Sequence, residues 1–354
     1  MQDAGGSQKP ERRLRVVQWA TGNIGMRSML AVIEHPALAL VGLYVYSDDK
    51  VGRDAGEMCG LTPMGVKATR SIDEIIVLKA DCVLYMPQQI NADDLCRLLE
   101  SGTNVVTTRT EFHLPNAVEP SLRLRIDEAC QRGGTSLHST GASPGFITEA
   151  VPLALLSIQR RLDALHISEY ADCSSRNSPQ MIFQMMGFGS APHPQAEAGR
   201  VHHLKGAFGP SLQLLAESVG LSIDSIEGHG EVAFANKDTV IAAGTVKAGT
   251  VAALRTTVSG MSKGKALINF TADWYVTTDI DKDWDLRGDG WRVRVDGDAP
   301  LDMNLQFTVA PELKAATTPG YTAHRAVNAV RYVCDAAPGI RTSAELPQFI
   351  PDLR

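Results

Sequence analysis

Short runs of β-branched and other apolar residues alternate with longer amphipathic segments over the first 150 residues of the chain. The short runs predict strands at residues 14–19, 38–46, 81–86, 104–108 and 135–138. In the longer segments the apolar positions recur at helical spacing, which predicts helices at, for example, 24–34, 91–101 and 120–132. Strands and helices in alternation are typical of a parallel sheet with crossover helices, so this part is predicted to be an α/β domain.

After about residue 150 the pattern changes to β-rich segments that follow one another with turns between them. These segments are HISEYAD, GEVAFAN, TVIAAGTV, VAALRTTVSG, ALINFTADWYVTT, WRVRVDG and LDMNLQF. Consecutive strands of this kind predict an α+β domain with an open, mostly antiparallel sheet. Helical segments near residues 179–187 and 210–220 interrupt the sheet, and a last helix is predicted from residue 322 to about 336, after Pro319-Gly320.

The first predicted strand runs into the stretch ATGNIG, residues 20–25, before the first helix. This stretch has the form G-x-G-x-x-G with alanine at the first position, which a tight turn of negative φ would accept. Such a loop lets a phosphate approach the backbone and the first N–H groups of the helix, so we predict a Rossmann-type dinucleotide site. Its binding residues are predicted to be Thr21, Gly22, Asn23 and Ile24. The alternative is an ordinary turn between a strand and a helix.

The two patterns divide the chain into four regions. We predict a disordered tail at 1–13, a dinucleotide-binding domain at 14–150 and a substrate domain at 151–318. A C-terminal helix and tail at 319–354 are predicted to pack back toward the cleft. Ligands of such folds bind outside the carboxyl ends of the parallel strands, so the residues that follow each strand are the candidates for chemistry.

The composition narrows the class of ligand. A net charge of −6 over 354 residues gives no global attraction to nucleic acid or to an anionic membrane surface, so we expect a small-molecule ligand. The six cysteines form no C-x-x-C pair, which speaks against a zinc site or a disulfide framework and predicts reduced thiols. Residues 1–13 hold no apolar signal-peptide core and the longest apolar stretch is too short for a bilayer, so a cytoplasmic protein without metal is expected.

The residues after the second strand bear on the choice of cofactor. Ser47 and Lys50 suit the 2′-phosphate of NADP, whereas Asp48 suits the 2′-hydroxyl of NAD, and an exposed charged turn is the third interpretation. We favour NADP and leave NAD open. Four further residues at later strand ends are predicted to border the cofactor: Pro87, Thr107, Gly141 and Ser143. Pro87 could equally be a proline that only ends a strand.

Glu111 follows the strand at 104–108 and is the best-placed acid for general acid/base chemistry. The alternative is a solvated glutamate in a loop. His113 lies in the same loop, and His324, Asn328 and Tyr332 recur every four residues on one side of the last predicted helix. The predicted substrate-pocket residues are His113, Phe146, Tyr170, His324 and Asn328.

The stretches VVQWATGNIG, VYSDDKVGRDAGEMCGL, NVVTTRTEF, STGASPGF and PGYTAHRAVNAV together resemble the dihydrodipicolinate-reductase-like oxidoreductases. Within that group the chain looks most like the branch of 2,4-diaminopentanoate dehydrogenase and the native amine dehydrogenases. The resemblance implies a homodimeric, NAD(P)-dependent enzyme that reductively aminates a ketone or aldehyde, or oxidatively deaminates the amine. Glu111 matches the place of a glutamate that assists amine chemistry in that branch.

Two other functions remain open. One is an imine or enamine reductase like dihydrodipicolinate reductase but with another substrate. That enzyme uses a His-His-x-x-Lys motif, and the spacing in His202-His203-Leu204-Lys205 is one residue short, so those roles are not carried over. The other is a non-catalytic dinucleotide sensor, which would need Gly22 but not Glu111. The identity of the substrate and the use of ammonia are not determined by the sequence.

Overall fold

The computed structural model describes residues 12–354, which form two compact units. The first unit comprises the chain up to Gly141 together with Pro319–Arg354, and the second is Ala142–Thr318. The division therefore falls at Gly141, where the sequence pattern had placed it at residue 150. Most of the predicted tail, residues 1–11, lies outside the described residues. Arg12 is held by two hydrogen bonds from its guanidinium to the carboxylate of Asp81, at 2.7 and 2.9 Å.

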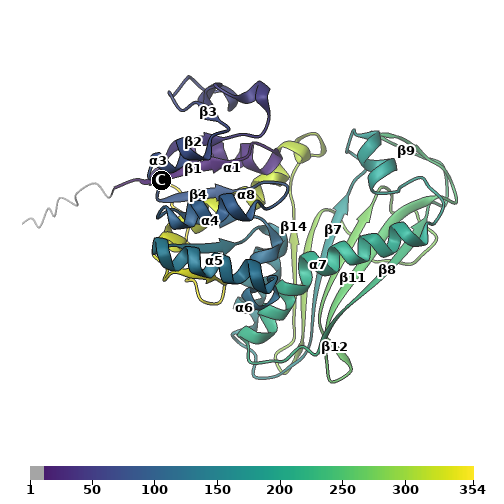
Figure 1. Ribbon diagram of the computed structural model, residues 1–354. Helices are drawn as coiled ribbons and strands as arrows, with labels where there is room; N and C mark the ends of the chain where they lie inside the picture. The colour runs from purple at the N-terminus through teal and green to yellow at the C-terminus, as the bar shows by residue number, and fades with distance from the viewer. Residues whose placement is uncertain (1–11) are drawn as a thin grey trace, which may run out of the picture. The chain divides into compact units, whose positions relative to one another are not determined.

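Among the described residues, the first unit forms a seven-stranded sheet in the order β15-β6-β5-β4-β1-β2-β3, and all its strand pairs are parallel (Figure 1). The strands are β1 (Leu14–Trp19), β2 (Leu38–Tyr44), β3 (Ala68–Thr69), β4 (Cys82–Tyr85), β5 (Asn104–Thr107), β6 (Ser136–Ser139) and β15 (Gly339–Arg341). The predicted α/β fold with a parallel sheet is thus confirmed. β3 and β15 were not predicted, because two or three residues are too few to show a period.

Helices cover both faces of this sheet. They are α1 (Asn23–Glu34), α2 (Ala55–Met58), α3 (Ile72–Val77), α4 (Ala92–Glu100), α5 (Pro120–Gly133) and α8 (Lys314–Cys334). α1 and α8 bury Met29 and Val330 in one apolar core, and α4 and α5 bury Leu95 and Ile126 in the core on the other face. Removal of these apolar side chains from water is the main force that holds the three layers together.

The last helix is longer than its predicted span from residue 322. α8 begins at Lys314, and Pro319 and Gly320 lie inside it. The prediction was wrong because it treated the Pro-Gly pair as a start signal. A proline lacks only its own N–H, and here the helix tolerates that loss within its first two turns. The buried side of α8 includes Ala326, Val330 and Val333, as the periodicity predicted.

The second unit forms a six-stranded sheet in the order β14-β13-β7-β12-β11-β8, in which only β7 and β12 are parallel neighbours. The strands of the unit are β7 (Leu162–Asp172), β8 (Ser225–Phe234), β9 (Thr239–Ile241), β10 (Gly244–Val246), β11 (Val251–Ser262), β12 (Lys265–Tyr275), β13 (Gly290–Gly297) and β14 (Leu301–Gln306). β9 and β10 form a separate hairpin. The predicted open, mostly antiparallel sheet is confirmed.

One face of this sheet carries the long helix α7 (Pro194–Ser218), which follows the short helix α6 (Val151–Leu156) along the chain (Figure 1). Phe208 of α7 stacks on Phe270 of β12, with ring centroids 3.8 Å apart. Gly228 of β8 permits close approach, because a Cβ there would lie 2.6 Å from Val201 of the helix. The helix that the sequence predicts at 210–220 begins sixteen residues earlier in the structure, at Pro194, and Pro210 lies inside it.

Candidate functional site

The turn between β1 and α1 leaves the start of the helix open to a ligand. Gly22 is the N-cap of α1, with no side-chain hydrogen bond to the first turn and no acidic residue in that turn. A Cβ built on Gly22 meets no atom within 4 Å. The first N–H groups of the helix thus have no capping partner and lie beside free space, an arrangement that favours a phosphate. Thr21, Asn23 and Ile24, the other residues predicted to bind the cofactor at this turn, flank Gly22 in the chain.

The first position of the glycine pattern departs from expectation. Ala20 has φ of +75°, not the negative value that the sequence suggested. Its N–H donates to the carbonyl of Tyr44 at 2.9 Å, and its carbonyl accepts from Gln18 Nε2 at 3.0 Å, so both backbone groups hold the left-handed turn. Such a conformation costs a non-glycine residue about 1–2 kcal/mol. Gly25 is needed for packing, because its Cβ would lie 2.2 Å from the Ala20 carbonyl oxygen.

The end of β2 brings a cation to this loop. Lys50 closes a short 3-10 turn, η1 (Asp48–Lys50), and its Nζ lies 3.1 Å from Thr21 Oγ1. The hydroxyl of Ser47 donates to Asp49, and Asp48 is paired with Arg70. The sequence analysis missed Arg70, because the two-residue strand β3 that precedes it shows no period in the sequence.

The VGRDAGE stretch has a structural role in the loop between β2 and β3. Asp54 accepts hydrogen bonds from the backbone N–H groups of Gly56, Met64 and Gly65 at 2.8, 3.0 and 2.8 Å. These bonds, that from Met64 foremost, hold the pKa of the Asp54 carboxyl below its ordinary value. Gly56 has no room for a side chain, since a Cβ would lie 2.2 Å from the Thr62 carbonyl oxygen. This motif therefore fixes the loop between β2 and β3.

The ends of β4 and β5 are joined through Thr107. Its buried hydroxyl donates to the carbonyl of Tyr85 at 2.7 Å and accepts from the N–H of Arg109 at 3.1 Å. Pro87, also predicted to border the cofactor, is buried just beyond β4. The side chain of Thr107 thus positions the turn that follows β5. Its single O–H donor is used in the bond to Tyr85.

Glu111 lies in that turn, in the 3-10 segment η2 (Thr110–Phe112). Its side chain is 39% exposed and Oε1 is paired with the guanidinium of Arg109. Arg109 also donates to the carbonyl of Gln88 at 2.6 Å, which ties the turn to the residues after β4. Among the described residues, Oε2 of Glu111 is buried without a hydrogen-bond partner. The sequence reasoning selected Glu111 and missed Arg109, which stands two positions earlier.

The remaining candidates of the first unit lie in different environments. His113 is only 2% exposed and belongs to the packed interior, not to an open loop. On α8, His324 is exposed and Asn328 is half-buried. Tyr332, on the same side of the helix, is engaged by the C-terminal segment: its hydroxyl accepts from the N–H of Ile350 at 2.8 Å. Gly141 is buried and ends the first of the two chain segments that make up this unit.

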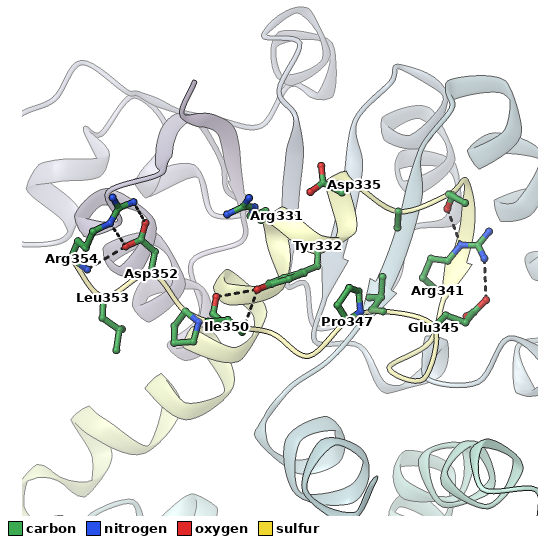
Figure 2. Close-up of a pocket in the computed structure, with 14 residues that line it drawn as sticks. Arg331, Tyr332, Asp335, Arg341, Glu345, Pro347, Ile350, Asp352, Leu353 and Arg354 are labelled. Carbon is green, nitrogen blue, oxygen red and sulfur yellow. Dashed lines mark hydrogen bonds and ion pairs between the residues drawn. The ribbon is translucent and has the colours of Figure 1, made fainter. Parts of the chain in front are cut away.

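Tyr332 also lines a cavity of about 1070 Å³ between the end of α8 and the C-terminal segment (Figure 2). Figure 2 shows Arg331 on the helix, Asp335 just after its last residue, and an Arg341–Glu345 pair on the segment that follows. None of the residues predicted for the cofactor or substrate lines this cavity. Its size alone therefore does not make it the reaction site.

The other candidates belong to the second unit. Ser143 and Phe146 lie in the kinked helical segment η4 (Ala142–Ala150), and Tyr170 is on β7 and 6% exposed. The carboxylate of Glu149 is buried and accepts from Ser211 Oγ at 2.7 Å, so it binds a side chain of α7. His202 and His203, whose spacing departs from the His-His-x-x-Lys motif, are exposed on α7.

Three further findings apply to residues 12–354. No group of three or more histidine, cysteine, aspartate or glutamate side chains could hold a metal ion there. No helix in this part of the chain has the length and apolar character needed to cross a membrane. The six cysteines are free thiols. Burial raises the pKa of the Cys130 and Cys173 thiols to about 11, which makes them poor nucleophiles near neutral pH.

Comparison with known proteins is consistent across sequence and structure. Residues 146–351 match the family described as the 2,4-diaminopentanoate dehydrogenase C-terminal domain. An amine dehydrogenase of Streptomyces virginiae is 27% identical over 347 residues, which cover 94% of this chain and 96% of that protein. A 2,4-diaminopentanoate dehydrogenase of Acetoanaerobium sticklandii is 23% identical over 355 residues, with 95% and 94% covered. The solved structure of an amine dehydrogenase from Mycobacterium smegmatis shares the fold, with a TM-score of 0.74, 20% identity, and 97% of this chain and 98% of that chain covered.

Proposed function

Because the chain belongs to the 2,4-diaminopentanoate dehydrogenase family, we propose that it is an NAD(P)-dependent oxidoreductase acting on a carbon that bears an amine or imine. The reaction is the reductive amination of a ketone or aldehyde, or the reverse oxidative deamination. The observation that carries the proposal is that one unit contains both an uncapped helix start, at Gly22, and a carboxylate, Glu111. One oxygen of that carboxylate has no hydrogen-bond partner among the described residues. Both lie in the first unit and follow strands of the same parallel sheet.

The residues present fit a nicotinamide dinucleotide. The free space over Gly22 and the unpaired N–H groups of α1 suit a pyrophosphate, whose charge is stabilised at a helix start. When bound, the nicotinamide ring donates or accepts a hydride. The chain contributes the binding loop and the proton chemistry.

We assign the proton chemistry to Glu111. Reductive amination moves a proton when the amine adds to the carbonyl and again when water leaves. Oε2 of Glu111 has no hydrogen-bond partner among the described residues and can accept and return that proton. The ion pair with Arg109 through Oε1 holds the carboxylate in one orientation, which leaves Oε2 as the reactive atom. The negative charge also stabilises a cationic iminium carbon through space.

We further propose NADP as the preferred cofactor, with NAD as the alternative. Lys50 is supported as a phosphate ligand by its position beside Thr21 of the glycine loop. Arg70 adds a second cation, since it is paired with Asp48 at the same strand end. A 2′-phosphate would receive charge-assisted hydrogen bonds from such groups, whereas Asp48 would have to leave Arg70 to serve a ribose hydroxyl.

The enzyme is proposed to act as a homodimer on a small carbonyl or amine compound. This assembly rests on the family resemblance, and light scattering of the purified protein would test it. A mass of one chain, about 38.1 kDa, would contradict it.

The function itself is tested by a screen for oxidation of NADPH and NADH with a panel of ketones and aldehydes, each with and without ammonium. We expect oxidation that requires both the carbonyl compound and ammonium. Oxidation that proceeds equally without ammonium would indicate a carbonyl reductase. No oxidation with any pair, together with no deamination of the matching amines, would contradict the proposal.

A further inference from the structure

Gln18, the residue before the last in β1, is a polar side chain in an apolar interior. It is fully buried and lies on the same face of the strand as Val16, one of the core residues that α1 covers. Its Nε2 donates to the carbonyl of Ala20 at 3.0 Å and to that of Trp19 at 3.3 Å. The Trp19 carbonyl also accepts from the N–H of Met86 at 3.1 Å, so the amide of Gln18 matters most for Ala20.

The other end of the same amide is unfavourable for stability. Oε1 of Gln18 is buried without a hydrogen-bond partner among residues 12–354, and such an acceptor lowers the free energy of unfolding. An apolar side chain at this position would avoid that loss, so the benefit of a glutamine here is the bond from Nε2 to the Ala20 carbonyl. Gly25 leaves room for this bond, because a Cβ there would lie 2.2 Å from the Ala20 carbonyl oxygen and 3.1 Å from Gln18 Nε2.

Ala20 is the residue that needs this support. Its φ of +75° is a conformation that glycine adopts freely and alanine does not, and it stands where the dinucleotide fingerprint has its first glycine. The carbonyl of Tyr44, the last residue of β2, holds the Ala20 N–H at 2.9 Å, and Gln18 holds the Ala20 carbonyl. That carbonyl and the N–H of Thr21 belong to one planar peptide, so the bond also fixes the direction of the Thr21 N–H in the loop before Gly22.

We propose that Gln18 is a positioning residue for the cofactor: its amide takes the place of the missing glycine by holding Ala20 in the left-handed turn, so that the phosphate loop is formed before the dinucleotide binds. Gln18 acts through Ala20 and does not itself contact the cofactor. Without its bond a fraction of the molecules leaves the turn, and the apparent affinity falls in proportion to the fraction that keeps it. The inference rests on the proposed dependence on NAD(P) and adds a residue, with its role, to that same site.

Gln18→Met tests the role, because it keeps an unbranched side chain of similar length and removes the donor. In fluorescence titrations of the purified chain we expect the Kd of NADPH and that of NADH to rise alike, by about tenfold, since the loop serves the pyrophosphate that both contain. Adding Ala20→Gly to the same chain should restore both Kd values to within about twofold of the wild type, because glycine adopts the turn unaided. Thr135→Val is the matched control: it removes a buried bond of the same kind, from the Thr135 hydroxyl to the Leu99 carbonyl at 3.0 Å, and should leave both Kd values unchanged.

Two outcomes would overturn the role of Gln18. One is wild-type affinity in Gln18→Met; the other is a weakened affinity that Ala20→Gly does not restore, which would mean that Gln18 acts on the core and not on the turn. If Gln18→Met does not fold, Gln18→Asn replaces it with the same expectations, since its shorter amide does not reach the Ala20 carbonyl.

These titrations need no turnover, so they separate the role of Gln18 from the proposed reaction. A wild type that binds a dinucleotide but converts no carbonyl compound or amine contradicts the reaction, and the Kd values of the variants still decide the role of Gln18. A wild type that binds neither NADPH nor NADH contradicts both.

Discussion

The guanidinium of Arg109 pairs with Oε1 of Glu111 and leaves Oε2 of the same carboxylate buried without a hydrogen-bond partner in the described part of the chain. One oxygen is thus used for orientation and the other is left for chemistry. The backbone supports this division, because the Arg109 N–H and the Arg109 carbonyl are bound by Thr107 and Ser139, respectively. The carboxylate that we propose as proton acceptor is therefore held at the end of β5 by the sheet itself.

Glu111→Gln should abolish most turnover while cofactor affinity persists. The substitution keeps the shape of the side chain and removes the proton acceptor, so we expect kcat to fall by roughly 10²–10⁴, the usual worth of a positioned general base. The measurement is steady-state turnover with the substrate pair found in the screen, together with titration of NADPH fluorescence on the same preparation.

Glu128→Gln is the control for the loss of a negative charge, because Glu128 is on α5 and, among residues 12–354, its ion pair is with Arg132 at the surface. It should retain turnover. If Glu111→Gln itself stays within about threefold of the wild type, Glu111 is not the acid/base. Arg109→Gln is the companion variant: it should lower kcat more than it changes the KM for the cofactor, since Arg109 acts by orienting Glu111.

Gly22→Val should lose the cofactor without loss of the fold. A Cβ at Gly22 meets no protein atom within 4 Å, so the branched side chain enters only the space that a pyrophosphate would occupy. We expect a melting temperature near that of the wild type and no detectable binding in NADPH titrations. Gly25→Ala should instead lower the melting temperature, because its Cβ would lie 2.2 Å from the Ala20 carbonyl oxygen. Equal cofactor binding by wild type and Gly22→Val would refute this placement.

Lys50→Ala should discriminate between the two cofactors. Loss of a cation that faces a 2′-phosphate costs about 1–3 kcal/mol of binding, which raises the Kd of NADPH by about 5- to 150-fold. The Kd of NADH should stay nearly constant, because NADH has no such phosphate. Lys79→Ala is a suitable control, since Lys79 follows α3 and lies away from the glycine loop in the chain. A parallel fall in both affinities, or no change in either, would exclude Lys50 as a phosphate ligand.

Asp54→Asn should destabilise the protein at neutral pH and lose its effect in acid. Backbone N–H groups, that of Met64 first, lower the pKa of Asp54 in the folded state below its ordinary value of 3.8. The folded state thus favours the carboxylate, and the stability it contributes is fully present above pH 3.8 and declines as the pH falls through the folded-state pKa. Urea unfolding at pH 7, 5 and 3 should show a constant difference from the wild type at the first two values and a smaller one at the third. A difference that grows toward pH 3 would contradict the assignment.

Much of the fold could be predicted because its signals are local. The five predicted strands of the first unit lie within two residues of β1, β2, β4, β5 and β6 at each end, since each strand is an apolar run that turn residues interrupt. The errors occurred where one residue was interpreted alone. Pro319 and Pro210 were treated as helix starts, yet both lie inside helices whose apolar contacts outweigh one lost hydrogen bond.

In the candidate site, too, local signals could be read from the sequence and contacts between distant residues could not. Glu111 and the Gly22 loop could be selected as candidates because each follows a strand of a recognisable parallel sheet, and the comparisons confirm the family resemblance. The side chains that bind these candidates could not be predicted from the sequence. The pairing of Arg109 with Glu111, of Lys50 with Thr21 and of Gln18 with Ala20 depends on which side chains the fold brings within hydrogen-bond distance.

The order of apolar and polar residues was thus sufficient to specify most of the elements and the parallel sheet, because helix and strand periods arise from the backbone of each segment. Contacts between distant segments required the folded chain. β15 joins the first sheet beside β6 although about 200 residues separate them, and Trp291 meets Glu169 only through the register of β13 on β7. Such pairings depend on the packing of the whole unit, and no local period encodes them.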